Sequence, residues 1–178
     1  FINKILTKAG LEKCNAATRP LHPDVLKLMA EETELGVLAS DEVASEYRSA
    51  IGDSNWLANT CCPAISVATS ILSGWGAKTT VSCMKAIKQV LRYLSGTSEA
   101  GLRYTKGDES GLVVSVDSDL AGLHAVTGEV RSRWGIVARY NGNLVAWQTN
   151  LISSVCLSSG EAEVNALSEG VKLALHLK

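Results

Sequence analysis

The sequence predicts an α+β protein, in which a mostly helical first half precedes a three-stranded antiparallel sheet covered by one helix. Three observations predict this class. The apolar residues follow a helical period up to Gly96 and an alternating period after it. The pair Asn141-Gly142, typical of a tight hairpin turn, separates two alternating runs. Residues 160–177 are amphipathic with a helical period. We therefore divide the 178 residues into 1–100 and 101–178.

The first part should contain several helices separated by glycine and proline. Apolar residues at helical spacing predict a helix over residues 1–12, ended by Gly10. The prolines of Arg19–Pro23 predict a loop, and residues 24–39 show only a weak helical pattern. A helix is expected over Asp41–Leu57, with an interruption near Gly52.

The clearest helix of the first part follows a proline-initiated turn. Pro63 should start a short helix. The strongest apolar stripe then runs over Thr80–Ser95, where Thr79 or Thr80 can cap the helix and Gly96 can end it.

Alternating apolar residues predict the strands of the second part. We expect a short strand at Leu102–Tyr104, a turn over 106–111, and a strand over Leu112–Asp119. The hairpin strands should span residues 133–140 and 144–149. Ser158, Ser159 and Gly160 should cap the closing helix.

Composition excludes several classes of protein. Hydrophobic residues make up 46% and charged residues 20%, as in ordinary globular domains. The formal net charge of −1 gives no overall signature of nucleic-acid binding.

Five cysteines without C-x-x-C spacing support neither a disulfide framework nor a zinc site, and indicate reduced thiols in an intracellular setting. No apolar run is long enough to span a bilayer. The N-terminus lacks a secretion signal and opens within an element, which suggests a processed or truncated chain.

Three acidic residues are candidate metal ligands. Asp117 and Asp119 end an apolar strand and should lie on one face of it. Carboxylates at such a place can bind a divalent cation, although solvated aspartates are also common at strand ends. At about 100° per residue, Glu163 falls on the helix stripe expected to pack on the sheet, whereas Glu161 falls opposite. A lone carboxylate is costly to bury unless it is paired or bound to metal. A position at the rim, near the helix start, would let Glu163 escape this cost; in either case Asp117 and Glu163 form a candidate constellation.

Five stretches in order resemble the polyproteins of copia-type retrotransposons. Val116–Gly122 resembles the first-strand motif of their ribonuclease H domain, and Leu157–Glu169 resembles its helix motif. Glu46–Gly52 and Lys85–Thr97 resemble the connection between polymerase and ribonuclease H. Phe1–Cys14 resembles the end of the reverse transcriptase. The similarity covers almost the whole chain, which makes it more specific than any single motif.

This resemblance implies a reverse transcriptase C-terminal and connection segment over 1–100 and a truncated ribonuclease H-like domain over 101–178. The family cuts the RNA strand of an RNA–DNA hybrid with four carboxylates around two Mg²⁺ or Mn²⁺ ions. Asp117 would be the first-strand ligand and Glu163 the helix ligand, with Asp119 a weaker candidate. The chain stops at Lys178, before the other two acids, so the isolated chain should be an inactive fragment.

Departures from the family pattern leave an alternative open. Leu120 stands where tryptophan is usual, Arg133-Trp134 where small hydroxyl residues are usual, and Asn150–Ile152 where basic residues are usual. Loss of basic residues weakens the expected binding to nucleic-acid phosphates. A domesticated, non-catalytic subunit docked to protein partners in a larger complex would also explain them. A non-catalytic nucleic-acid binder is a third reading, which the near-neutral charge disfavours.

Overall fold

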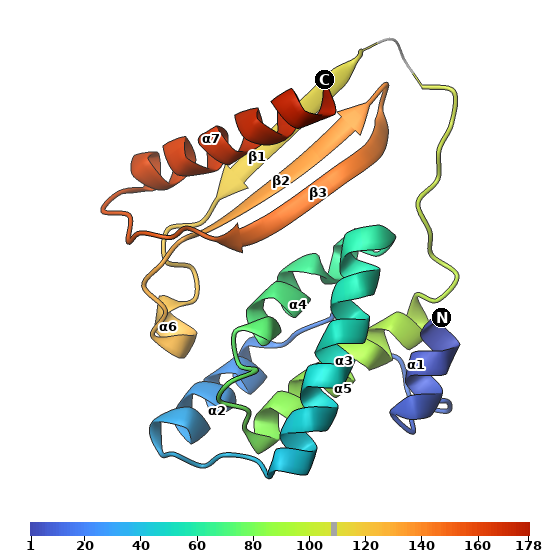
Figure 1. The fold of residues 1–178 in the computed structure, drawn as a ribbon, viewed down its shortest axis with the longest axis vertical. Helices are drawn as coiled ribbons and strands as arrows, with labels where there is room; N and C mark the ends of the chain where they lie inside the picture. The colour runs from blue at the N-terminus through green and yellow to red at the C-terminus, as the bar shows by residue number, and fades with distance from the viewer. Residues whose placement is uncertain (108–109) are drawn as a thin grey trace. The chain divides into compact units, whose positions relative to one another are not determined.

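The structure, a computed structural model, describes residues 1–107 and 110–178. The chain divides into two compact units, Phe1–Gly101 and Leu102–Lys178. The first unit is helical, and the second combines a three-stranded antiparallel sheet with α7 (Figure 1). This arrangement confirms the predicted α+β class.

The first unit is built around one helix. Its central helix is α5 (Val81–Gly96), which packs against all four other α-helices of the unit. These are α1 (Ile2–Lys8), α2 (Pro23–Glu34), α3 (Asp41–Thr60) and α4 (Ser66–Ser73), the last preceded by a 3₁₀ turn at Pro63–Ile65. The short helix predicted to start at Pro63 and the helix predicted over Thr80–Ser95 are both confirmed.

The start of α5 is fixed by polar groups. Thr80 is its N-cap residue, and the Thr80 backbone N–H donates to Cys83 Sγ at 3.3 Å. Glu32 of α2 accepts from the Ser82 backbone N–H at 3.0 Å and from Ser82 Oγ at 2.8 Å. Burial raises the pKa of Glu32, but hydrogen bonds from Thr80 and Ser82 outweigh it, so the pKa is lowered overall. An ionised Glu32 therefore joins α2 to the N-terminus of α5, where negative charge is favoured.

Two predictions for the helices were wrong. The α3 helix runs through Gly52 without a break, because the buried residues Tyr47, Ile51 and Leu57 on either side hold the helix against the core. Pro23 is not part of a loop but the first residue of α2, a position where proline loses no hydrogen bond.

In the second unit, antiparallel strands pair in the order β1 (Leu112–Ser118), β2 (Arg133–Tyr140) and β3 (Asn143–Leu151). The short α6 (His124–Thr127), which the sequence analysis did not predict, lies between β1 and β2. The register aligns Val116 with Ile136 and Val137 with Trp147. The Asn141-Gly142 turn has φ of 47° and 77°, so the predicted tight hairpin is confirmed.

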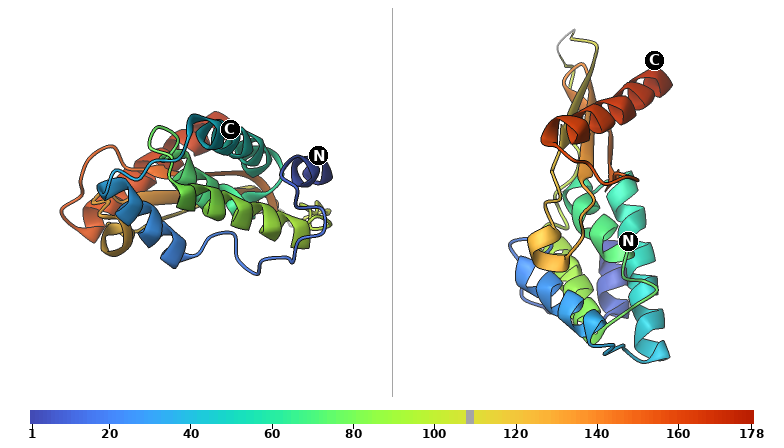
Figure 2. Two further views of the ribbon diagram at one scale, coloured as in Figure 1. Left: turned by 90° about the horizontal axis from the view of Figure 1, so that it is seen from below. Right: turned by 90° about the vertical axis from the view of Figure 1, so that its left-hand side faces the viewer.

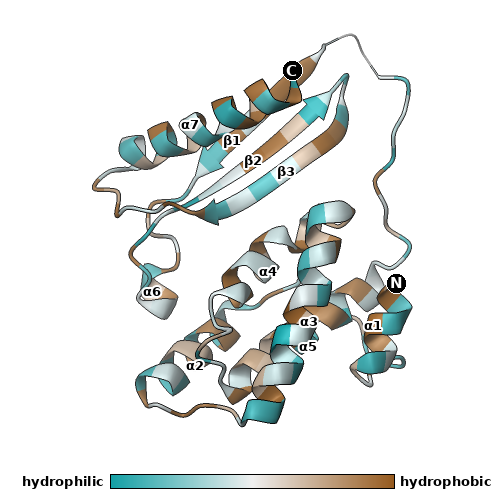
Figure 3. Ribbon diagram, viewed as in Figure 1, coloured by the Kyte–Doolittle hydropathy of each residue, from teal (hydrophilic) through white to brown (hydrophobic). Residues whose placement is uncertain are grey.

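The α7 helix (Ser159–Leu177) covers one face of this sheet (Figure 2). Its contacts are with β1 and β2, over a core formed by Ile136, Ala138 and Leu173. Apolar residues recur along the whole of α7 and along the strands (Figure 3). Within the residues described, no helix is both long and apolar enough to cross a membrane.

The segment before β1 differs from the prediction. Leu102–Tyr104 forms no strand. The side-chain amide of Asn143 instead holds this segment, because it accepts from the Thr105 N–H at 2.8 Å and donates to the Thr105 carbonyl at 2.9 Å. The turn predicted over 106–111 includes residues 108 and 109, which lie outside the described residues.

Candidate functional site

Asp117 lies near the end of β1 with its side chain exposed. Burial alternates along the strand, so Val114 and Val116 contact the α7 side while Asp117 lies on the opposite face of the sheet. Its backbone pairs with Gly135 of β2, a residue with no side chain to cover the carboxylate. The structure therefore presents the Asp117 carboxylate to solvent on a rigid strand.

Glu163 lies in the second turn of α7 and is exposed. Of the two positions that the sequence leaves open for Glu163, within the packed stripe or at its rim, the structure has the rim. The buried stripe consists of Ala162, Ala166, Gly170 and Leu173. Glu163 borders this stripe, on the same flank as Gly170, which lies seven residues later. A carboxylate at the rim of a packing face avoids the cost of burial.

Both acids lie toward the same end of the second unit, but Asp117 lies on the sheet face that points away from α7, the helix that carries Glu163. Gly170 packs on Val114 and Val116 of β1, and the first turn of α7 lies beside the end of the sheet where β1 finishes (Figure 1). Glu163 is two turns from Gly170 toward that end. Across the described part of the chain, no group of three or more His, Cys, Asp or Glu side chains is placed to hold a metal ion. Two acids without a third do not make a complete site for two divalent ions.

Asp119 has a structural contact that the sequence analysis did not foresee. It follows the last residue of β1, and its Oδ1 accepts from the Arg133 backbone N–H at 2.7 Å. The Asp119 N–H in turn donates to the Arg133 carbonyl at 3.0 Å. Gly122 lies against the Asp119 carboxylate so closely that a Cβ there would overlap it. Asp119 thus ties the β1–β2 connection to the start of β2.

An ion pair orders the end of the same connection. The Arg131 guanidinium donates to both carboxylate oxygens of Glu129, at 2.9 and 2.8 Å. These hydrogen bonds outweigh burial and lower the pKa of Glu129 to about 2. Burial lowers the pKa of Arg133, while the charges of Asp119 and Glu129 oppose that shift. The connection beside Asp117 is therefore held by charged groups rather than by an apolar core.

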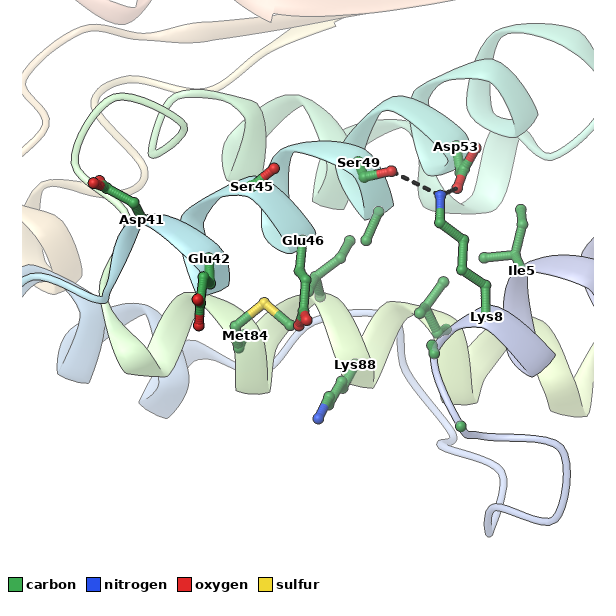
Figure 4. A pocket seen from close by; sticks show the side chains of 15 residues that line it. Ile5, Lys8, Asp41, Glu42, Ser45, Glu46, Ser49, Asp53, Met84 and Lys88 are labelled. Carbon is green, nitrogen blue, oxygen red and sulfur yellow. Dashed lines mark hydrogen bonds and ion pairs between the residues drawn. The ribbon is translucent and has the colours of Figure 1, made fainter.

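The first unit carries a groove of about 950 Å³ between α1, α3 and α5. Figure 4 shows Glu46 of α3 reaching toward Met84 of α5, over a floor of apolar side chains. Lys8 of α1 spans the groove and donates to Ser49 Oγ at 2.7 Å and to Asp53 Oδ2 at 3.1 Å. No local sequence motif marks this groove, because its walls come from three helices far apart in the chain.

Comparison with known proteins identifies relatives over most of the chain. Secreted RxLR effector protein 161 of Plasmopara viticola is 34% identical over 131 residues, which cover 74% of this chain and 90% of that protein. Uncharacterized mitochondrial protein AtMg00810 of Arabidopsis thaliana is 30% identical over 168 residues, or 94% of this chain. The retrovirus-related Pol polyprotein from transposon RE1 of Arabidopsis thaliana is 28% identical over 94% of this chain.

The chain spans only part of the longer relatives. It covers 65% of AtMg00810 and 11% of the RE1 polyprotein. No protein-family model and no solved structure matches the chain. The similarity to the polyproteins extends through both structural units. The chain belongs to the family of retrovirus-related Pol polyproteins from copia-type transposons, as a fragment of such a polyprotein.

Proposed function

We propose that residues 101–178 are the first part of a ribonuclease H unit acting on RNA–DNA hybrids, and that residues 1–100 are the end of the reverse transcriptase and its connection. The observation that supports the proposal is that Asp117 near the end of β1 and Glu163 near the start of α7 lie on two adjoining elements toward one end of the second unit, although on different faces of the sheet. The similarity to retrovirus-related Pol polyproteins, which extends through both units, supports the proposal.

The proposal includes inactivity of the isolated chain. Hydrolysis by two metal ions needs enough carboxylates to hold both ions beside the scissile phosphate. Asp117 and Glu163 supply two hard oxygen ligands of the kind that Mg²⁺ or Mn²⁺ prefers. Asp119 already accepts a backbone hydrogen bond, so it is the poorer candidate for a third. These residues do not form a complete binding site, and we derive no reaction step from them.

The domesticated structural subunit is not favoured by the comparisons, which place the chain among transposon polyproteins. Nucleic-acid contact by the helical unit also gains no support from charge, because Asp41, Glu42, Glu46 and Asp53 outnumber Lys8 and Lys88 in its groove. The proposed function therefore rests on the second unit.

Cleavage of a labelled RNA–DNA hybrid in Mg²⁺ tests the proposal. The isolated chain should not cleave the hybrid. A fusion to the segment that follows the aligned region in the RE1 polyprotein should cleave it, and Asp117→Asn or Glu163→Gln in the fusion should abolish cleavage.

Glu161→Gln is the matched control, since Glu161 is an exposed acid of the same helix on another flank. Its side chain accepts from the Leu157 N–H at 2.8 Å, which glutamine can also do. Cleavage should survive this change. Cleavage by the isolated chain, or full activity of the fusion carrying Asp117→Asn, would contradict the proposal.

A further inference from the structure

Cys61 and Cys62 form an adjacent pair of thiols at the end of α3, outside the site described above. Their Sγ atoms lie 3.7 Å apart, close enough for either thiol to donate a hydrogen bond to the other. Cys61 is exposed and Cys62 is half-buried, so a small molecule in solvent can reach the pair. Two thiols this close together can both bond to one ligand atom.

The backbone of both cysteines is fixed by the end of the helix. The N–H groups of Cys61 and Cys62 both donate to the Leu57 carbonyl, at 3.0 and 2.8 Å. Pro63, whose ring fixes its φ, starts the 3₁₀ turn directly after Cys62. Only rotation of the two side chains is therefore left to bring both sulfur atoms onto a shared ligand.

The separation of the sulfur atoms fits two bonds to one central atom. Two thiolates bound at about 2.3 Å to one tetrahedral ion lie about 3.8 Å apart. A pyramidal, three-coordinate centre needs a similar or slightly shorter separation. A disulfide would instead require about 2.05 Å, well below the 3.7 Å between the Cys61 and Cys62 sulfur atoms. Chelation therefore needs less movement than oxidation of the pair.

The number of ligands selects the kind of central atom. Structural zinc takes a tetrahedral set of protein ligands, and in the described part of the chain no third His, Cys, Asp or Glu side chain joins the pair in a metal-binding group. An organic arsenic(III) compound is complete with two sulfur ligands. The C-terminal end of a helix also disfavours thiolates, and a divalent cation must displace the thiol protons. An arsenic oxide instead removes both protons as water.

We propose that Cys61 and Cys62 form a bidentate dithiol site for one trivalent, thiophilic metalloid centre of the arsenic(III) type. With an organic arsine oxide, two As–S bonds form and the bonds between arsenic and oxygen break. The oxygen leaves as water with both thiol protons. Arsenic stays trivalent, so the step consumes no oxidant or reductant. The proposal does not depend on the function proposed above.

Intact mass spectrometry of the whole chain with phenylarsine oxide tests the site. An excess of a monothiol should be present, because it displaces arsenic from a single cysteine more readily than from a chelating pair. The wild-type chain should carry one phenylarsine group, which the dithiol 2,3-dimercaptopropanol removes. Cys61→Ser and Cys62→Ser should each weaken binding by about 100-fold or more, because the second As–S bond is missing. An absent adduct, or one that survives in either variant, overturns the proposal.

Cys14→Ser is the matched control, since Cys14 is a partly exposed thiol of the same unit. This variant should bind phenylarsine oxide as the wild-type chain does, and loss of binding would contradict the assignment to Cys61 and Cys62. Serine is close to cysteine in size, so circular dichroism should show the same helix content in all three variants.

Unfolding tests what the fold contributes. In urea above the unfolding transition, Cys61 and Cys62 remain neighbours in the sequence but lose the backbone hydrogen bonds to Leu57. The affinity for phenylarsine oxide should then fall about tenfold or more, because the pair must be ordered on binding. An unchanged affinity would show that adjacency in the sequence is sufficient, and would overturn a site built by the fold.

Discussion

Gly170 of α7 lies directly on Val116 of β1, so closely that a Cβ on Gly170 would overlap the Val116 side chain. Val114 lies next to the same point. The close approach depends on the small residues of the packed helix face, Ala162, Ala166 and Gly170. The absence of a side chain at position 170 thus sets the distance between helix and sheet.

We predict that Gly170→Ala destabilises the second unit by about 1–3 kcal/mol, because the added methyl group must displace a branched side chain. Gly52→Ala is the control, since Gly52 lies inside α3 with open space around it. That change should stabilise the first unit by about 0.5–1 kcal/mol. Hydrogen exchange of β1 and α3 amides measures both effects. Stabilisation by Gly170→Ala would contradict the contact.

Tyr47 is fully buried and donates a hydrogen bond from its hydroxyl to the Leu72 carbonyl at 2.7 Å. Tyr47→Phe leaves this carbonyl without that donor in an apolar core and should destabilise the first unit by about 1–2 kcal/mol. Tyr140→Phe, at a position 55% exposed, should change stability by less than about 0.5 kcal/mol. Urea unfolding compares the two. Equal effects would show that the buried hydrogen bond contributes nothing.

The Glu129–Arg131 pair should make the second unit acid-sensitive. Hydrogen bonds from Arg131 lower the pKa of Glu129 from 4.5 to about 2. The stabilisation is therefore complete above about pH 5 and is lost as the pH falls toward about 2. Arg131 is 42% exposed, so solvent screening limits the effect to about 0.5–1 kcal/mol. The stability difference between the wild-type chain and Glu129→Gln should disappear near pH 2. A difference that persists there would exclude ionisation of Glu129 as its cause.

The adjacent thiols should differ in reactivity. Cys61 is exposed, whereas burial, with a smaller contribution from Cys61, raises the pKa of Cys62 to about 11. Since the thiolate is the reactive form, iodoacetamide near about pH 8 should modify Cys61 well before Cys62. Mass spectrometry of timed samples measures this order. In Cys61→Ser, Cys62 should still react slowly, because burial is the larger cause; rapid modification would contradict this.

Much of the fold follows from local patterns, since turn residues and helix caps act within a few positions. Asn141-Gly142, Thr80 and Ser158 each mark an element boundary that the structure contains. The Leu102–Tyr104 strand failed for a non-local reason. The backbone of the next residue, Thr105, is held by the Asn143 side chain, which lies too far along the chain for any local pattern to reveal.

The candidate site shows a second limit. Periodicity places Glu163 correctly around the α7 axis, but it does not say which side of the axis packs on the sheet. The stripe expected from the sequence was centred near Glu163, whereas the buried stripe is turned toward Ala162 and Ala166 and leaves Leu167 and Val171 exposed. Small residues allow the α7 backbone to approach the sheet closely. The need for this close approach becomes visible only when the neighbouring strands are in place.

The hairpin at Asn141-Gly142 also bears on the order in which the sheet assembles. Tyr140 and Asn143 are neighbours across a two-residue turn, so β2 and β3 can pair at little entropic cost. Leu112 must instead find Tyr140 across the whole β1–β2 connection. During synthesis β1 emerges from the ribosome before β2, and its pairing with β2 must close the longer loop. We therefore expect the β2–β3 hairpin to form before β1 joins it, so that pulse-labelled exchange shows Asn143 protected before Val114.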